Sequence, residues 1–412
     1  MNKFEKEIEV RGHLVDSSIL TRIFDKVMDM KGDFTVEQFV IGKKKEDHSY
    51  ARLVIRGNTE SHLSNILENV FREGATSIST DSVTCVKAPR DMVLPDDFYS
   101  TTNNATQLYF ENTWINVERM MMDKCIVLDP VTRTAECKTN REVKKGDLIV
   151  TGEKGIKIVP QERPREGVDI FQFMSSTSSS ERPTQQIAKK VALDIVKTKQ
   201  NSGKIIVVAG PVLVHSGASD IIAKMIRLGL IDGILSGNAL AVHDIENALL
   251  GTSLGMHVDD GTLAVRGHRN HMSIVNEVFK FGSIRSMVES GRLTKGIMYE
   301  CIKSNVPFVL CGSIRDDGPI PDVITDVVEA QKQYKSLLKD AKLVIMLSTM
   351  LHSIAVGNML PASVKVIAVD INQPVVTKLL DRGTTQAIGV VTDIGSFLPI
   401  VMKNLENLSF KE

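Results

Sequence analysis

Apolar and polar positions in the first ninety residues follow two periods. Four stretches alternate roughly or carry short apolar runs, which predicts β-strands at residues 4–10, 34–41, 51–55 and 78–86. Two others carry apolar side chains at helical spacing, which predicts helices at residues 19–30 and 60–73. The order β-α-β-β-α-β is typical of the ferredoxin-like fold. We therefore predict a ferredoxin-like α+β domain over residues 1–90.

The next segment has a different pattern, in which polar turns separate short apolar runs. These runs lie at residues 114–117, 125–128, 147–150 and 155–159. The pattern predicts a small β-rich module over residues 91–160. Residues 161–183 are rich in Pro, Ser, Glu and Arg, so we interpret them as a linker between domains or as a loop that folds over a ligand.

From residue 184 to residue 412, strands alternate with helices. The strands are short, continuous and rich in β-branched residues, and lie at residues 205–209, 231–235, 307–311, 343–347, 364–369 and 387–391. The amphipathic helices between them include residues 220–228, 276–289, 322–338 and 395–405. This alternation predicts an α/β domain, with a parallel sheet covered by helices on both faces. Ligands of such sheets bind beyond the carboxyl ends of the strands.

Polar or acidic residues follow five of the six predicted strands. The six segments are Gly210-Pro211, Ser236-Gly237-Asn238-Ala239, residues 312–318, residues 348–352, residues 370–372 and Thr392-Asp393. Turn formation and helix capping explain any one of them, but in a parallel sheet all six lie at one edge. No G-x-G-x-x-G follows any strand, so the common dinucleotide fingerprint is absent.

A nucleotide can bind at this edge without that fingerprint. The segment Ser348-Thr349-Met350-Leu351-His352 stands between a strand and a helix, where backbone N–H groups can bind a pyrophosphate. Asp370 ends a strand and can accept hydrogen bonds from both hydroxyls of a ribose. These features favour a nucleotide site, and the similarity to deoxyhypusine synthases given below implies that the nucleotide is NAD, with candidate contacts from Asn238, Ala239, Asp317, Ser348, Thr349, Met350, Leu351, His352, Asp370, Thr392 and Asp393.

Composition narrows the function classes. The charges balance, with 50 Lys+Arg and 50 Asp+Glu, so nothing points to nucleic acid or an anionic membrane. The five cysteines include no C-x-x-C pair, which argues against a disulfide scaffold or structural zinc. His268 and His271 have no evident third ligand, so we predict no metal. The N-terminus lacks an apolar signal region, and no long apolar run follows, so we expect a cytoplasmic protein.

Two resemblances to known families add to the predictions of fold and site. Residues 238–393 are similar to the NAD-binding domain of deoxyhypusine synthases, with residues 347–358 in place of that family's glycine-rich turn, histidine and asparagine. Nearly the whole chain resembles the family labelled for lysine-oxoglutarate reductase/saccharopine dehydrogenase, which includes archaeal ornithine cyclodeaminases and the C-terminal halves of cyanobacterial arginine dihydrolase/ornithine cyclodeaminase fusions. The motifs are residues 12–17, 102–107, 267–271, 296–301, 312–319 and 391–394.

The second resemblance implies an ammonia-lyase of arginine and ornithine metabolism, which converts ornithine to proline and ammonia with NAD and serves proline biosynthesis. Such a reaction needs a base, a partner for the substrate carboxylate and exclusion of water. As catalytic candidates we take Asp316 and Asp317 for the base or the ammonium partner, and Arg315, or else Arg269, for the carboxylate. We expect a small amino-acid substrate, no nucleic acid, no membrane and a homo-oligomer.

Several points stay open at this stage. His243, Asp244 and Glu246 either line the site or face water, and Lys378 is interpreted as a helix-surface lysine. A saccharopine-type dehydrogenase and a non-catalytic sensor of NAD or amino acids are the alternative functions.

Overall fold

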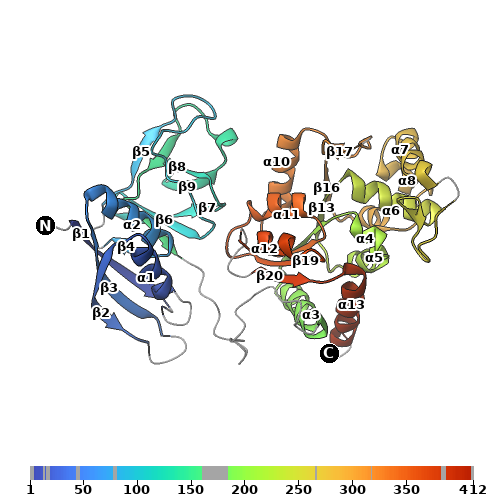
Figure 1. The fold of residues 1–412 in the computed structure, drawn as a ribbon. Helices are drawn as coiled ribbons and strands as arrows, with labels where there is room; N and C mark the ends of the chain where they lie inside the picture. The colour runs from blue at the N-terminus through green and yellow to red at the C-terminus, as the bar shows by residue number, and fades with distance from the viewer. Residues whose placement is uncertain are drawn as a thin grey trace. The chain divides into compact units, whose positions relative to one another are not determined.

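The computed structural model describes residues 4–12, 14, 19–42, 47–77, 81–159, 184–264, 267–316, 318–381 and 387–409. They form two compact units (Figure 1). One contains the described residues up to Val159 together with Met359–Ser363, and the other contains the rest. The predicted linker, residues 161–183, lies outside the described residues.

The first unit begins with a four-stranded antiparallel sheet and two helices. Its elements are β1 (Phe4–Gly12), α1 (Ile19–Asp29), β2 (Asp33–Val40), β3 (Ser49–Gly57), α2 (Glu60–Arg72) and β4 (Thr76–Ser77). The strand order is β2-β3-β1-β4, and a core of its own lies between the sheet and the two helices. The element order is the β-α-β-β-α-β order that the sequence pattern predicts.

The position predicted for the fourth strand is wrong. Among the described residues after α2, Thr76 and Ser77 pair with β1, whereas β5 (Thr84–Lys87) pairs antiparallel with β10 (Leu148–Thr151) in the next sheet. Val83 and Cys85 pack into the core of that second sheet. Alternation shows that a segment is a strand but does not show which sheet it joins.

The second sheet of the first unit has seven strands in the order β11-β6-β7-β9-β8-β10-β5. Its other strands are β6 (Ala105–Phe110), β7 (Thr113–Glu118), β8 (Cys125–Asp129), β9 (Thr134–Lys138) and β11 (Ile156–Val159), with a 3-10 turn, η1 (Asn140–Glu142). The sequence pattern missed β6 and β9. In β9 the buried positions are held by Ala135 and Cys137, which are too small to mark an apolar period.

The second unit is built on a seven-stranded parallel sheet. Its strands are β12 (Lys204–Ala209), β13 (Gly233–Gly237), β16 (Phe308–Cys311), β17 (Val323–Ile324), β18 (Ala341–Leu347), β19 (Lys365–Asp370) and β20 (Ala387–Val391). The order is β17-β16-β13-β12-β18-β19-β20, and every neighbouring pair is parallel. Five successive residues of β12, 205–209, are buried, so both faces of the sheet are covered, as predicted.

Helices flank this sheet (Figure 1). They are α3 (Thr184–Gln200), α4 (Val212–His215), α5 (Ser219–Arg227), α6 (Asn238–Leu250), α7 (Asn270–Phe281), α8 (Ile284–Glu289), α9 (Ile297–Lys303), α10 (Val327–Leu338), α11 (Met350–Gly357), α12 (Gln373–Asp381) and α13 (Ile394–Ser409). The small hairpin β14 (Thr252–Ser253) and β15 (Met256–His257) and the 3-10 turn η2 (Gly267–Arg269) lie between α6 and α7.

Two predicted helices need correction. The helix expected at 276–289 is two helices, because Gly282 adopts a left-handed φ of 80° that ends α7, and Ser283 caps α8. The helix expected at 322–338 begins at Val327, where the Asp326 side chain accepts from the Val328 and Glu329 amides. Val323 and Ile324, which lie before it, form β17 instead.

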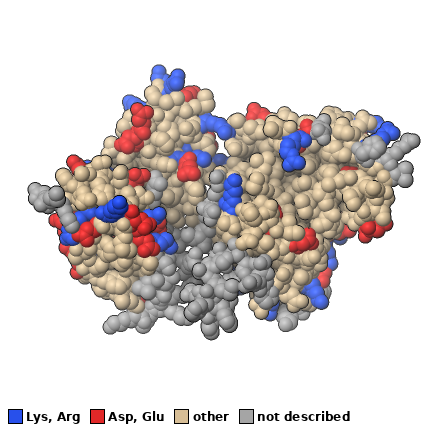
Figure 2. Space-filling model, in the orientation of Figure 1, with Lys and Arg blue, Asp and Glu red and all other residues tan. Residues whose placement is uncertain are grey.

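None of the helices in the described ranges is both long and apolar enough to cross a lipid bilayer. On the face of the molecule in Figure 2, basic and acidic side chains of the described residues are interspersed. This distribution agrees with the balanced charge of the sequence.

Candidate functional site

The parallel sheet has a reversal of strand order between β12 and β18. From β12 the chain proceeds to β13, β16 and β17 on one side, then returns to β18 on the other side and continues outward to β20. In sheets of this kind ligands bind at the carboxyl ends of the two strands at the reversal. The segments after β12 and β18 therefore lie at the centre of the candidate site.

These two segments are in close backbone contact. The Gly210 N–H donates to the Leu347 carbonyl at 2.9 Å, and a Cβ at Gly210 would lie 2.1 Å from the Ser348 carbonyl oxygen. No side chain larger than that of glycine fits at position 210 without a shift of backbone. Ser348 itself has a φ of 44°, in the left-handed region that favours glycine. Ser348 thus adopts a backbone conformation that glycine favours, in a turn (residues 348–352) whose sequence contains no glycine.

The helix α11 starts at this turn. Thr349 is its N-cap residue, but the Thr349 side chain caps no backbone amide. The side chains of Met350 and Leu351 are exposed, so neither is held in the core of the unit. The first amides of a helix have no acceptor within the helix, and with the helix dipole they attract anions. The start of α11 fits a pyrophosphate.

His352 is held in one orientation at the same edge. The Tyr334 hydroxyl donates to the Ser236 carbonyl at 2.5 Å and lies 3.1 Å from His352 Nδ1. Because the hydroxyl has a single proton, His352 Nδ1 is the donor to Tyr334, which leaves Nε2 as an acceptor. Nε2 lies against Gly237, where a Cβ would approach it to 2.7 Å. Burial lowers the pKa of His352, while the Asp316 carboxylate opposes that shift.

The sequence pattern did not single out Tyr334. It lies on α10, which runs between β17 and β18, and its side chain is buried. A lone tyrosine on the apolar face of a helix resembles ordinary core in a sequence, so only the hydroxyl contacts distinguish it.

Asn238 and the segment after β16 support one another. The Asn238 side chain donates to the Gly318 carbonyl at 3.4 Å and accepts from the Ile320 amide at 3.1 Å. The Asp316 carboxylate accepts from the Ser313 amide at 2.8 Å, an ordinary turn contact. Through these contacts Asn238 and Asp316 stabilise the conformation of the segment after β16. Asp317, a candidate for both catalysis and cofactor binding, lies outside the described residues.

The remaining arginine and lysine candidates are exposed. Arg315 and Arg269 both have exposed side chains, on the segment after β16 and in η2 respectively. Lys378 is exposed on α12, which confirms its interpretation as a helix-surface lysine.

At the other side of β18, acidic residues follow β19 and β20. The Asp370 carboxylate is half-buried and accepts from the Asn372 amide at 2.8 Å, which leaves one carboxylate oxygen for other donors. The Thr392 amide donates to the Asp370 carbonyl, so the two segments are adjacent. Asp393 accepts from the Ser396 amide at the start of α13. Ala239, like these residues, is only partly buried.

The helix α6 carries the candidates that were expected either to line the site or to face water. His243, Asp244 and Glu246 are all buried, which excludes the second of the two alternatives, that they face water. Asp244 accepts from the Ile297 and Met298 amides at the start of α9, and burial raises its pKa to about 6. Asp244 is therefore a structural cap.

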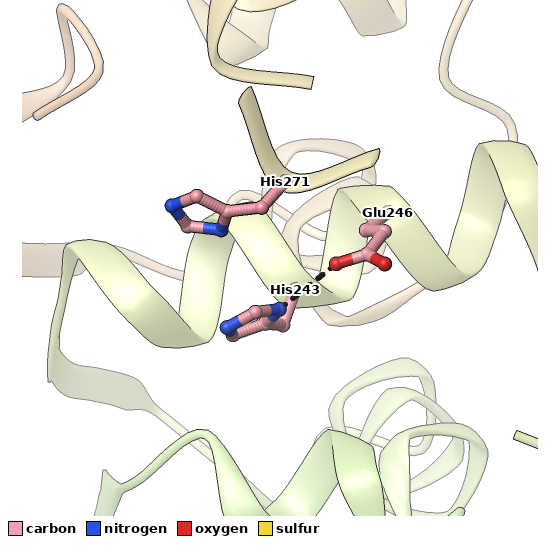
Figure 3. Close-up of side chains that lie close together, drawn as sticks. All are labelled: His243, Glu246 and His271. Carbon is pink, nitrogen blue, oxygen red and sulfur yellow. Dashed lines mark hydrogen bonds and ion pairs between the residues drawn. The ribbon is translucent and has the colours of Figure 1, made fainter. Parts of the chain in front are cut away.

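His243, Glu246 and His271 lie together (Figure 3). One ligand atom from each lies within 4.8 Å of the other two, and the residue types are ones that hold metal ions. We predicted no metal because His271 lacked a third ligand in the sequence pattern. That reason is wrong, because α6 places His243 and Glu246 beside His271. The side chain of His268 is outside the described residues.

A fourth group beside this cluster, His215 at the end of α4, was not singled out from the sequence. Its ring meets that of His243 edge-on with centroids 4.9 Å apart, and its Nδ1 lies 2.7 Å from Ser253 Oγ. Burial, assisted by His243, lowers the pKa of His215 to about 4, so its ring is neutral near pH 7. The position of His215, four residues after Pro211, is the only sequence signal that could have indicated it.

Family models match most of the chain. Residues 189–401 match the C-terminal Rossmann-fold region of arginine dihydrolase ArgZ-like proteins, and residues 105–188 match the first C-terminal region of the same proteins. Residues 5–104 match the conserved region of the LOR/SDH bifunctional enzyme.

Individual relatives match over nearly the full chain. The ornithine cyclodeaminase of Methanothermobacter thermautotrophicus is 53% identical over 98% of both chains. The apo crystal structure of the cyanobacterial arginine dihydrolase ArgZ has a TM-score of 0.87 at 36% identity and covers 99% of this chain and 59% of its own. The ternary complex of AgrE with ornithine and NAD⁺ has a TM-score of 0.55 at 38% identity. The match covers 100% of this chain and 59% of the AgrE chain. The chain therefore belongs to the family that comprises the Methanothermobacter ornithine cyclodeaminase and the C-terminal regions of ArgZ and AgrE.

Proposed function

We propose that this chain is an NAD-dependent ornithine cyclodeaminase, which converts ornithine to proline and ammonia. The observation that carries the proposal is full-length similarity to a relative of that name, together with a relative that binds both ornithine and NAD⁺. When bound, NAD supplies the acceptor for the hydride at Cα of the substrate and returns it at the end of the reaction. The chain itself must supply the base, the partner for the substrate carboxylate and the exclusion of water.

The residues around β12 and β18 fit NAD. Gly210 has no side chain, so the two strand ends at the reversal approach closely. The first amides of α11 offer donors for a pyrophosphate. Asp370 has a carboxylate oxygen for ribose hydroxyls. Ser348, Thr349, Met350, Leu351 and Asp370 are the contacts that we propose; His352, Ala239, Thr392 and Asp393 lie at the same edge and stay candidates.

Proline at position 350 tests the pyrophosphate assignment. Met350 is the first residue of α11, where proline fits the helical φ, and Thr349 has the extended conformation that a following proline requires. Met350→Pro should leave the melting temperature unchanged and remove one N–H donor. A hydrogen bond to a charged group contributes about 1.5–3 kcal/mol, so NAD affinity should fall about 10- to 100-fold. Unchanged NAD affinity by calorimetry would exclude the Met350 amide from the site.

The fate of a Cα label tests the activity. Ornithine with deuterium at Cα should give proline that keeps the label, with one ammonia per turnover and only a catalytic requirement for NAD⁺. A saccharopine-type dehydrogenase would accumulate NADH and transfer deuterium to it. A sensor would bind NAD and show no turnover of ornithine or other amino acids. Mass spectrometry of proline and absorbance of NADH distinguish the three functions.

Finer features of the architecture also stay proposals. We propose a ferredoxin-like domain at residues 1–90, which the β2-β3-β1-β4 order supports, a β-rich module at 91–160, and an NAD-binding domain of the deoxyhypusine-synthase type at 184–412. A cytoplasmic location and a homo-oligomer stay predictions. Sedimentation of the purified chain measures the oligomeric state.

A further inference from the structure

Glu246 is a buried carboxylate whose hydrogen bonds come from three directions. It accepts from Thr252 Oγ1 at 2.8 Å, from the Gly255 amide at 3.2 Å and from His243 Nδ1 at 2.9 Å. Burial alone would raise the pKa of Glu246, but these hydrogen bonds, His243 first, bring it below its ordinary value. Glu246 is therefore ionised at neutral pH.

This charge fixes the tautomer of His243. A carboxylate has no proton to give, so His243 Nδ1 carries the hydrogen of the 2.9 Å bond and Nε2 keeps its lone pair. Figure 3 shows Nε2 of His243 turned away from Glu246. An imidazole oriented in this way by a buried carboxylate is the arrangement that accepts protons in hydrolytic triads.

The surroundings hold the ring of His243 in place. No lysine or arginine of the described residues forms an ion pair with Glu246, so His243 is the ionisable group that bonds this carboxylate. The rings of His215 and His271 pack against His243 at centroid distances of 4.9 and 5.1 Å and restrict its rotation.

The cluster connects to the ligand-binding edge of the sheet. The helix α6 begins directly after β13, so His243 lies about 8 Å along the helix axis from Asn238. His215 ends α4, which starts directly after Gly210-Pro211 at the β12 end. The next residue, Ser216, has its carbonyl oxygen 2.8 Å from the position of a Cβ at Gly395, beside Asp393.

We propose that Glu246 and His243 form the dyad that takes a proton from the side-chain ammonium of ornithine, which rests on the proposed function. The N–H bond breaks, its electron pair stays on nitrogen for the attack that closes the ring, and the proton binds to His243 Nε2. No electrons are transferred in this step. We propose the dyad as the base in place of Asp316, because a buried carboxylate orients His243, whereas the Asp316 carboxylate lies in an ordinary turn and accepts from the Ser313 amide.

A metal ion is the competing occupant of the cluster. The contacts argue against a metal bound directly by Glu246, because each of its oxygens already accepts a hydrogen bond from the chain. A metal at His243 Nδ1 would have to replace the His243–Glu246 hydrogen bond, whereas a metal at His243 Nε2 would keep that bond and occupy the lone pair that the proton needs. Elemental analysis of the purified enzyme distinguishes the two occupants.

Glu246→Gln is the main test. The carboxamide can still accept from Thr252 and Gly255, but its NH2 group faces His243 Nδ1 and moves the ring proton to Nε2. The kcat for ornithine should fall by about 10²- to 10⁴-fold, while the affinities for NAD and ornithine stay within a few-fold of wild type.

His243→Ala is the second variant, and it carries the test should Glu246→Gln fail to fold. Added imidazoles should restore turnover, and the restored rate should increase with the basicity of the added imidazole, which simple filling of space would not produce. His257→Ala, at an exposed position of β15, is the matched control and should behave as wild type.

Three results would overturn the dyad while leaving the cyclodeaminase proposal intact, given that the wild type forms proline in the same assay. The first is a folded Glu246→Gln enzyme with wild-type kcat. The second is a folded His243→Ala enzyme whose rescue is absent or independent of base strength. The third is one equivalent of a transition metal in the wild type that is lost from both variants. A wild type that forms no proline from ornithine would instead remove the cyclodeaminase proposal and the dyad with it.

Discussion

Alanine at position 210 is expected to abolish NAD binding and to destabilise the second unit by about 3 kcal/mol. The new Cβ would lie 2.1 Å from the Ser348 carbonyl oxygen, and the atoms that must move are backbone atoms of the turn before α11. The amides proposed to bind the pyrophosphate belong to that same turn. Thermal unfolding and NAD titration of Gly210→Ala measure both effects.

Gly357 provides the matched control for this change. It is the last residue of α11, and a Cβ there would meet nothing within 4 Å. Gly357→Ala should leave NAD affinity unchanged and stabilise the protein by up to about 1 kcal/mol, because alanine is the better helix former. If Gly210→Ala binds NAD as tightly as Gly357→Ala, the two strand ends at the reversal do not form the cofactor site.

The sequence predicted the parallel sheet well because its strands are buried on both faces. Such strands are continuous β-branched runs, and six of the seven in the second unit were predicted within two residues of their bounds. The seventh, β17, has only two residues, Val323 and Ile324, and merges with the apolar period of the helix that follows. A local period cannot separate a short strand from an adjacent helix.

The candidate site was predicted in its position but only partly in its members. The position follows from topology, since the ends of parallel strands share an edge, and Ser348 to His352 and Asp370 lie where that rule places them. His215 and Tyr334 contribute through contacts between distant elements, so no spacing in the sequence reveals them. The same holds for the contact of His243 and Glu246 with His271.

Removal of the Asp370 carboxylate is expected to weaken NAD binding about 10- to 100-fold without unfolding the chain. The side chain is half-buried at the end of β19, and its loss removes one charged acceptor for the ribose, a contact worth about 1.5–3 kcal/mol. An acidic residue at this place also repels the 2′-phosphate of NADP, so Asp370→Ala should bind NADP relatively better than the wild type does. Ile371→Ala, at the exposed neighbouring position, should change neither affinity. Titration with both dinucleotides decides the matter: an unaltered NAD affinity together with an unaltered NAD to NADP ratio in Asp370→Ala would place the ribose away from β19, and the cofactor would then have to be sought on the β13 side of the reversal.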